Sequence, residues 1–270
     1  MISITSTQIA ADLTLVRTKK PLVHHITNFV VMNETANMTL CVGGLPIMSH
    51  AKEEVAEMVK MANCLLLNIG TLSPEWIESM LIAGKQANQS GIPIILDPVG
   101  AGATKLRTES SHRLMQELKI AIVRGNLAEV ATLAGHQAEI RGVESIGASS
   151  EKEIVASALA EKYQCVVAIT GAQDVVSDGK NIGYIDNGHV MMTTVTGTGC
   201  MSTTVLACFA GVQRDYFRAA VSGLVAYGIA GELAAKTTDG KPGSFHTALY
   251  DSMKQLTDAD ITKFAKVSFR

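Results

Sequence analysis

Short hydrophobic runs alternate with amphipathic stretches along most of this chain. The runs are continuous rather than interrupted by polar residues, which is typical of parallel strands covered by helices on both faces. Turn-forming residues bound each run. The pattern predicts five strands, at Leu22–Ile26, Cys64–Gly70, Ile92–Gly100, Ile120–Asn126 and Cys165–Gly171.

The stretches between these runs have a helical period. Residues 52–62 repeat apolar side chains at the spacing of one helix face. Residues 73–87 begin with Ser73, a favourable N-cap, and Pro74, which suits the first helical position. Strands that alternate with helices predict an α/β fold with a mainly parallel sheet flanked by helices. No linker or repeat divides the chain, so we expect a single domain over residues 1–270.

The pattern changes between Asp174 and Thr196. DG and NG turns separate short β-prone runs there, which predicts an antiparallel meander at one edge of the sheet. A long apolar helix is predicted after it, over Asp215–Lys236, and the small residues in that helix permit close packing.

Composition narrows the classes of partner. The net charge is -2 and the chain has no basic run, so the electrostatic footprint of a nucleic-acid binder is missing. No targeting segment and no membrane-spanning stretch is evident, which favours a soluble cytoplasmic protein that makes no membrane contact. Five cysteines without CxxC spacing favour reduced thiols over disulfides or a zinc site. We therefore expect small-molecule ligands.

Polar, glycine-rich segments follow each predicted strand. The carboxyl ends of parallel strands meet at one edge of a sheet, so these segments can line one crevice. An ordinary polar turn is the alternative for each segment taken alone. The segment TGTGC, at Thr196–Cys200, is the sharpest, because Gly197 and Gly199 let backbone N–H groups converge at the start of a helix. That geometry suits phosphate, although no P-loop, Rossmann or protein-kinase motif is present.

Charged side chains stand at two other strand ends. Asp97 comes before Pro98, which holds the backbone extended, and it suits a metal or a charged group; a turn or N-cap role is the alternative. Arg124 offers a forked donor for phosphate. Asn126 and Glu129 suit magnesium through water, or they form a capping pair.

Two adjacent histidines, His24 and His25, lie in the first predicted strand. Neighbouring strand residues point to opposite faces, so we expect both to be hydrogen-bonded structural residues rather than metal ligands.

Taken in order, these segments resemble the hydroxyethylthiazole kinase family of the ribokinase-like superfamily. The resemblance covers nearly the whole chain, and seven motifs in the same order are far more specific than any one. It implies a three-layer ribokinase-like α/β fold and ATP-dependent phosphorylation of 4-methyl-5-(2-hydroxyethyl)thiazole with Mg²⁺, in thiamine biosynthesis. It also implies a homotrimer with sites between subunits. The motifs are HHITNFVVMNETAN, GGLPIMSHAKEEV, LNIGTL, ILDPVGAGAT, VRGNLAEV, AITG and VTGTGC.

The resemblance also implies roles for individual residues. Three would contact the thiazole, three would bind ATP, and two would belong to the magnesium and phosphate side. In that order they are Met48, Gly197 and Asn28; Arg124, Thr170 and Asn126; Asp97 and Glu129.

Cys200 stands where many ribokinase-like enzymes carry an aspartate, the base for the acceptor hydroxyl. A thiol pKa of about 8.5 falls at a helix N-terminus, which predicts some thiolate near neutral pH. We hypothesise that Cys200 orients the hydroxyl and accepts its proton late, so Cys200→Asp should keep activity and Cys200→Ala should lose most of it.

Other functions remain open at this stage. Cys200 could be a covalent nucleophile if His24, His25 or His50 lay near enough to act as its base. The chain could phosphorylate hydroxymethylpyrimidine or pyridoxal instead, or bind thiazole without catalysis.

Overall fold

A computed structural model describes residues 3–135 and 148–270, and these contain a single mixed β-sheet. All five strands predicted from the hydrophobic runs are present, most of them a few residues shorter than expected. The strands are β1 (Leu22–Ile26), β2 (Leu45–Met48), β3 (Cys64–Asn68), β4 (Ile94–Asp97), β5 (Ile122–Asn126), β6 (Val166–Thr170), β7 (Asp174–Ser177), β8 (Ile182–Ile185) and β9 (Val267–Phe269).

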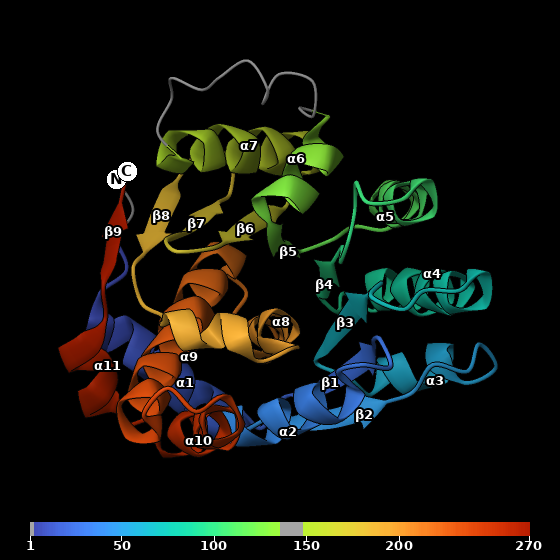
Figure 1. The fold of residues 1–270 in the computed structure, drawn as a ribbon. Helices are drawn as coiled ribbons and strands as arrows, with labels where there is room; N and C mark the ends of the chain where they lie inside the picture. Colours follow the sequence, from blue (N-terminus) through green and yellow to red (C-terminus); the bar gives the residue numbers. More distant parts are fainter. Residues whose placement is uncertain (1–2, 136–147) are drawn as a thin grey trace.

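The sheet is parallel over most of its width. Its strand order is β2-β1-β3-β4-β5-β6-β7-β8-β9, and the pairs from β2 to β6 are parallel while those from β6 to β9 are antiparallel (Figure 1). The predicted antiparallel edge is therefore confirmed. All parallel strands consequently end at the same edge of the sheet.

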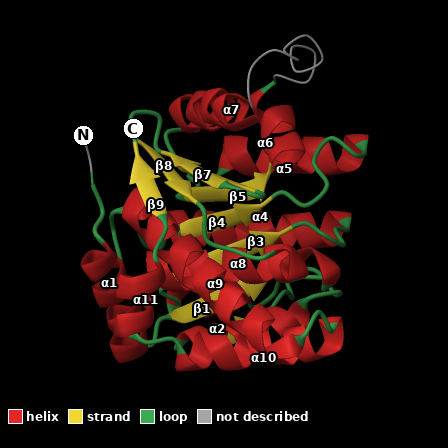
Figure 2. Cartoon of the chain, turned by 60° about the vertical axis from the view of Figure 1, so that its left-hand side comes forward, coloured by secondary structure: helices red, strands yellow, loops and turns green. Residues whose placement is uncertain are grey.

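Helices cover both faces of this sheet, which gives three layers (Figure 2). Leu65 and Leu67 of β3 pack toward one helix layer, and Cys64 and Leu66 pack toward the other, because successive strand residues face opposite ways. One layer holds α3 (Val55–Lys60), α4 (Pro74–Gln89), α5 (Lys105–Glu117), α6 (Leu127–Ala134) and α7 (Ala148–Tyr163). The other holds α1 (Ser6–Lys19), α2 (Met32–Val42), α8 (Thr198–Ala210), α9 (Tyr216–Thr238), α10 (Pro242–Gln255) and α11 (Asp258–Phe264).

Local signals explain several helix ends. Ser73 caps α4 by accepting a hydrogen bond from the Trp76 N–H, and Pro74 occupies the first helical position, as predicted. The helix predicted over residues 52–62 is present but shorter, since α3 spans only Val55–Lys60. None of the helices in the described residues combines the length and hydropathy needed to cross a membrane.

Two details of the sheet differ from the prediction. The strand β2 was not predicted, since LPIM is short and contains Pro46, but an edge strand tolerates a proline. The run after the NG turn is not a strand: Val190–Thr194 forms a 3₁₀ helix, η2, which His189 caps. The C-terminal strand β9 pairs with β8 in its place.

The two histidines of β1 are structural, as predicted. His24 Nε2 lies 2.8 Å from the Ser49 carbonyl oxygen, and His25 Nε2 lies 3.1 Å from Thr39 Oγ1. Burial, with the neighbouring His24, lowers the pKa of His25 to about 3, so this ring stays neutral in the folded protein.

Acid should therefore destabilise the folded protein in part through His25. The unfolded chain binds a proton at this histidine below its ordinary pKa of about 6.5, whereas the folded protein does not bind one until about pH 3. Stability is lost as pH falls through this window, by about 2 kcal/mol between pH 7 and pH 5. We expect His25→Gln to remove that part of the loss. Urea unfolding of both proteins at both pH values measures the difference; an equal loss in both would contradict the assignment.

Candidate functional site

Two adjoining cavities open at the carboxyl edge of the parallel strands. The first, here called the α8 cavity, has a volume of about 410 Å³ and lies at the N-terminus of α8. It gathers most of the predicted site residues from five separate segments. Its lining includes Asn28, Gly70, Asp97, Arg124, Asn126, Glu129, Gly197, Gly199 and Cys200.

The second, here called the η2 cavity, has a volume of about 560 Å³ and lies between β6, η2 and α9. Thr170 lines it, and Met192, Leu224 and Tyr227 give it an apolar wall. Arg124 and Gly199 line both cavities. The two cavities therefore adjoin at Arg124 and Gly199.

The TGTGC segment forms the start of α8, as its glycines predicted. Gly197 is the N-cap with φ +85°, and a Cβ there would lie 2.8 Å from Val31 Cγ1. A Cβ on Gly199 would lie 2.8 Å from Arg124 Nη1. Gly197 is therefore required by its left-handed backbone, whereas a side chain at position 199 would displace the end of the Arg124 side chain. The first helical hydrogen bond runs from the Met201 N–H to the Gly197 carbonyl (2.8 Å), so the amides before it have no carbonyl partner within the helix. Such a helix start attracts anions.

Arg124 and Asp97 form the charged centre of the α8 cavity. The Arg124 Nη1 lies 3.9 Å from Asp97 Oδ2, and Arg124 Nη2 donates to Thr170 Oγ1. Asp97 Oδ2 also accepts hydrogen bonds from Thr203 Oγ1 (2.7 Å) and Asn68 Nδ2 (3.0 Å), while Oδ1 has no hydrogen-bond partner among the described residues. Burial raises the pKa of Asp97 to about 6, against the opposing effect of Arg124. The N-cap alternative for Asp97 is wrong, because Thr104 caps α5.

Asn126 and Glu129 form a capping pair at the start of α6. Asn126 Oδ1 accepts from the Glu129 N–H (2.9 Å), and Glu129 Oε2 accepts from the Asn126 N–H (2.8 Å). Glu129 Oε1 accepts from the Gly100 N–H (2.8 Å), which ties the loop after β4 to this helix. The capping interpretation is confirmed, and the same carboxylate still lines the α8 cavity.

Cys200 is surrounded by amides. Its Sγ lies 3.2 Å from Asn68 Nδ2 and 3.8 Å from Asn28 Nδ2, and both amides donate to it. Burial, with the carboxylate of Asp97 as a further cause, raises the pKa of the Cys200 thiol to about 12. The expected thiolate at neutral pH is therefore wrong, since desolvation outweighs the helix N-terminus. Cys200 is a thiol in this protein.

The histidines do not supply a base for Cys200. His24 and His25 bond to Ser49 and Thr39, and the His50 ring stacks on Trp76 with centroids 4.2 Å apart. With no histidine among the described hydrogen-bond partners of a protonated thiol, a covalent nucleophile at Cys200 is not favoured.

Two residues that shape this site were not predicted. Asn68, at the end of β3, contacts Asn28, Asp97 and Cys200. The signal was a polar residue at the carboxyl end of an apolar strand. The other is Arg107, which donates to the carbonyls of residues 69, 70 and 99 and so joins the loops that follow β3 and β4.

Met48 is the predicted site residue that lies apart. It ends the edge strand β2, opposite His25 of β1, and lines neither cavity. Its side chain is half-buried.

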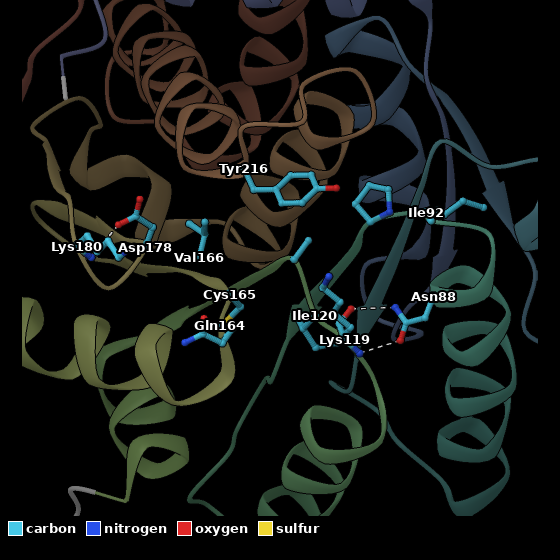
Figure 3. A pocket seen from close by; sticks show the side chains of 13 residues that line it. Asn88, Ile92, Lys119, Ile120, Gln164, Cys165, Val166, Asp178, Lys180 and Tyr216 are labelled. Carbon is cyan, nitrogen blue, oxygen red and sulfur yellow. Dashed lines mark hydrogen bonds between the residues drawn. The ribbon is translucent and has the colours of Figure 1, made fainter.

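A third cavity, of about 430 Å³, lies at the amino ends of β4, β5 and β6, opposite the carboxyl edge. Figure 3 shows the side chains that line it. Lys119, Gln164 and Lys180 are among the residues that line it, and the Asn88 amide is hydrogen-bonded to the Lys119 backbone there. None of the predicted site residues reaches it, so the carboxyl edge remains the candidate site.

This chain is similar in sequence to proteins named as kinases. The sequence model of the hydroxyethylthiazole kinase family matches residues 13–259. A hydroxyethylthiazole kinase of Chloroflexus aurantiacus is 55% identical over 253 residues, which are 94% of each chain. The enzyme of the same name from Roseiflexus castenholzii is 54% identical over 261 residues, 97% of this chain and 96% of its own.

Solved structures agree with the match to the hydroxyethylthiazole kinase family. Hydroxyethylthiazole kinase from Pyrococcus horikoshii OT3 superposes with a TM-score of 0.90 at 41% identity, over 97% of this chain and 98% of its own. A Staphylococcus aureus pyridoxal kinase in complex with pyridoxal gives 0.64 at 14% identity, over 93% and 98%. At that identity the second likeness shows the shared ribokinase-like fold alone.

Proposed function

Because the chain belongs to the hydroxyethylthiazole kinase family and so phosphorylates the hydroxyl of 4-methyl-5-(2-hydroxyethyl)thiazole with ATP, we propose that the transfer takes place in the α8 cavity. The observation that carries this location is Arg124, which lines both cavities between Asp97 and Thr170. ATP binds in the η2 cavity with its phosphates toward α8. The acceptor hydroxyl enters the α8 cavity beside Asn28 and Cys200.

The η2 cavity has an apolar wall and a polar end, and both support ATP binding. Met192, Leu224 and Tyr227 offer apolar surface for the base, whereas Thr170 and Arg124 stand at the end that joins the α8 cavity. The transferred phosphate then lies near the start of α8, where the amides of residues 198–200 have no helical partner. Arg124 and these amides stabilise the charge on the phosphate during transfer.

Magnesium fits the residues of the α8 cavity. Asp97 Oδ1 is buried and has no hydrogen-bond partner among the described residues, and Glu129 lines the same cavity. Mg²⁺ keeps several waters and uses one or two carboxylates together with phosphate oxygens. That preference agrees with the finding that no cluster of three or more metal-ligating side chains exists within residues 3–135 and 148–270. Asp97 and Glu129 would hold the ion, which neutralises phosphate charge when bound.

Cys200 orients the acceptor hydroxyl in this proposal. The thiol is protonated at neutral pH, so it acts as a hydrogen-bonding group rather than as a strong base. Transfer through a loose transition state needs little early proton removal, and positioning of the hydroxyl is therefore the larger requirement.

A homotrimer with sites between subunits is part of the proposal. Met48 lies on an edge strand outside both cavities, so a neighbouring subunit is needed for it to reach a bound thiazole. Exposed apolar side chains of β1–α2 and β2, namely Phe29, Val30, Leu40 and Leu45, support an interface on this side. Light scattering should give three times the chain mass of 28.6 kDa. We also propose a single domain over residues 1–270 and a cytoplasmic location, which five free cysteines support.

One assay tests the activity. The protein is incubated with ATP, Mg²⁺ and hydroxyethylthiazole, and in parallel with hydroxymethylpyrimidine or pyridoxal, and the phosphorylated product is detected by mass. We expect thiazole phosphate well ahead of the other products, and its loss when EDTA replaces Mg²⁺. Turnover that is unchanged in EDTA would contradict the metal site, and preference for another acceptor would contradict the thiazole as the substrate.

A further inference from the structure

Asn68 is a buried amide whose hydrogen-bond partners all line the α8 cavity. It is 1% exposed at the carboxyl end of β3, where the preceding strand residues are apolar. Burial of an amide destabilises the folded protein unless the amide is hydrogen-bonded. The hydrogen-bond partners of Asn68 therefore indicate which groups it positions. Those partners come from three other segments of the chain: the loop after β1, the end of β4, and the start of α8.

The four hydrogen bonds of this amide fix its orientation. Asn68 Oδ1 accepts from Asn28 Nδ2 (2.7 Å) and from the Gly70 N–H (2.9 Å). Asn68 Nδ2 donates to Asp97 Oδ2 (3.0 Å) and to Cys200 Sγ (3.2 Å). Turning the amide over would set its N–H groups against the donors of Asn28 and Gly70, so only one orientation satisfies all the partners.

The fixed amide has a consequence for the thiol. Cys200 Sγ accepts a hydrogen bond from Asn68 on the β3 side, which holds the sulfur at the wall of the α8 cavity. The same side chain holds Asn28, which lines that cavity and donates to Cys200 at 3.8 Å. One amide thus sets both groups proposed to meet the acceptor hydroxyl.

We infer that Asn68 is a positioning residue that aligns the Cys200 thiol and the Asn28 amide with the acceptor hydroxyl. The inference rests on the proposed role of Cys200. It adds that this role depends on a side chain of β3, that of Asn68. Asn68 lies behind the cavity wall and acts through its neighbours, because it is not among the residues that line either cavity.

A double-mutant cycle between Asn68 and Cys200 tests the inference. Asn68→Ala should lower kcat about tenfold, the effect of one lost alignment of 1.4 kcal/mol, and leave KM for ATP within about twofold. In the Cys200→Ala background the same change should cost about threefold or less, because the thiol that it aligned is already gone. Kinetics of the wild type, both single variants and the double variant give this comparison.

The matched control is Asn88→Ala. Asn88 also uses both ends of its amide: Nδ2 donates to the Lys119 carbonyl (3.0 Å), and Oδ1 accepts from the Lys119 N–H (2.8 Å) (Figure 3). It lies at the opposite edge of the sheet, so its loss should lower the melting temperature without changing kcat. If Asn68→Ala does not fold, Asn68→Leu fills the same space without the polar groups and takes its place in the cycle.

The outcomes separate the two ideas. If Cys200→Ala alone has wild-type kcat, the proposed role of Cys200 fails and the inference falls with it. If Cys200→Ala is impaired but the effects of the two changes simply multiply, Cys200 keeps its role and Asn68 is not its positioning residue. A kcat for Asn68→Ala equal to that of Asn88→Ala would also overturn the inference.

Discussion

Replacing Arg124 with alanine should lower kcat/KM for ATP about a thousandfold, the scale seen when a charge-stabilising group is removed from a phosphoryl-transfer site. Arg124 lines both cavities and stands between Asp97 and Thr170. Its guanidinium therefore lies where we propose that the phosphate passes from donor to acceptor. We expect kcat to fall and KM for ATP to rise, while KM for the thiazole changes much less.

Arg124→Lys is the matched variant. Lysine keeps the positive charge but lacks the planar fork, so it should recover only part of the loss. The carboxylate of Asp97 loses its cation in Arg124→Ala, and thermal unfolding must therefore accompany the kinetics. The decisive measurement is steady-state kinetics with ATP varied at saturating thiazole. A folded Arg124→Ala protein with wild-type kcat/KM would refute the transfer site at the start of α8.

The parallel part of the fold was predictable because its strands are buried on both faces. Continuous apolar runs such as residues 64–67 predict strands that are buried on both faces, and the turns that follow mark the edge where the candidate site lies. The antiparallel edge was harder. The pairing of β8 with β9 joins segments about eighty residues apart, and no local pattern specifies such a partner.

The residues of the candidate cavity were predicted from their position at the ends of strands and at the start of a helix. Arg124, Asp97 and Cys200 do meet in one cavity, because their strands and helix converge at the carboxyl edge. Asn68 was not predicted, because an asparagine at the end of an apolar strand is also common where there is no functional site. Its role depends on partners at positions 28, 97 and 200, and only the folded chain brings those together.

The ionisation of Cys200 is the clearest failure of sequence reasoning. A helix N-terminus favours a thiolate, and that much is visible in TGTGC. Burial and the nearby carboxylate of Asp97 act in the opposite direction, and their sizes depend on tertiary packing. The folded protein therefore holds a thiol where the sequence predicted some thiolate.

Removal of that thiol should still be costly. In the proposed role, Cys200 aligns the acceptor hydroxyl for attack, so we expect Cys200→Ala to lower kcat about a hundredfold. Cys200→Asp should keep activity, because a carboxylate at the same position accepts a hydrogen bond from the hydroxyl and can also take its proton. Both variants are compared with the wild type by kcat and by thiazole binding measured calorimetrically. An Asp variant as inactive as the Ala variant, with both folded and binding thiazole, would exclude this role for position 200. Comparison of the two variants thus tests whether phosphoryl transfer needs a hydrogen-bonding side chain at position 200.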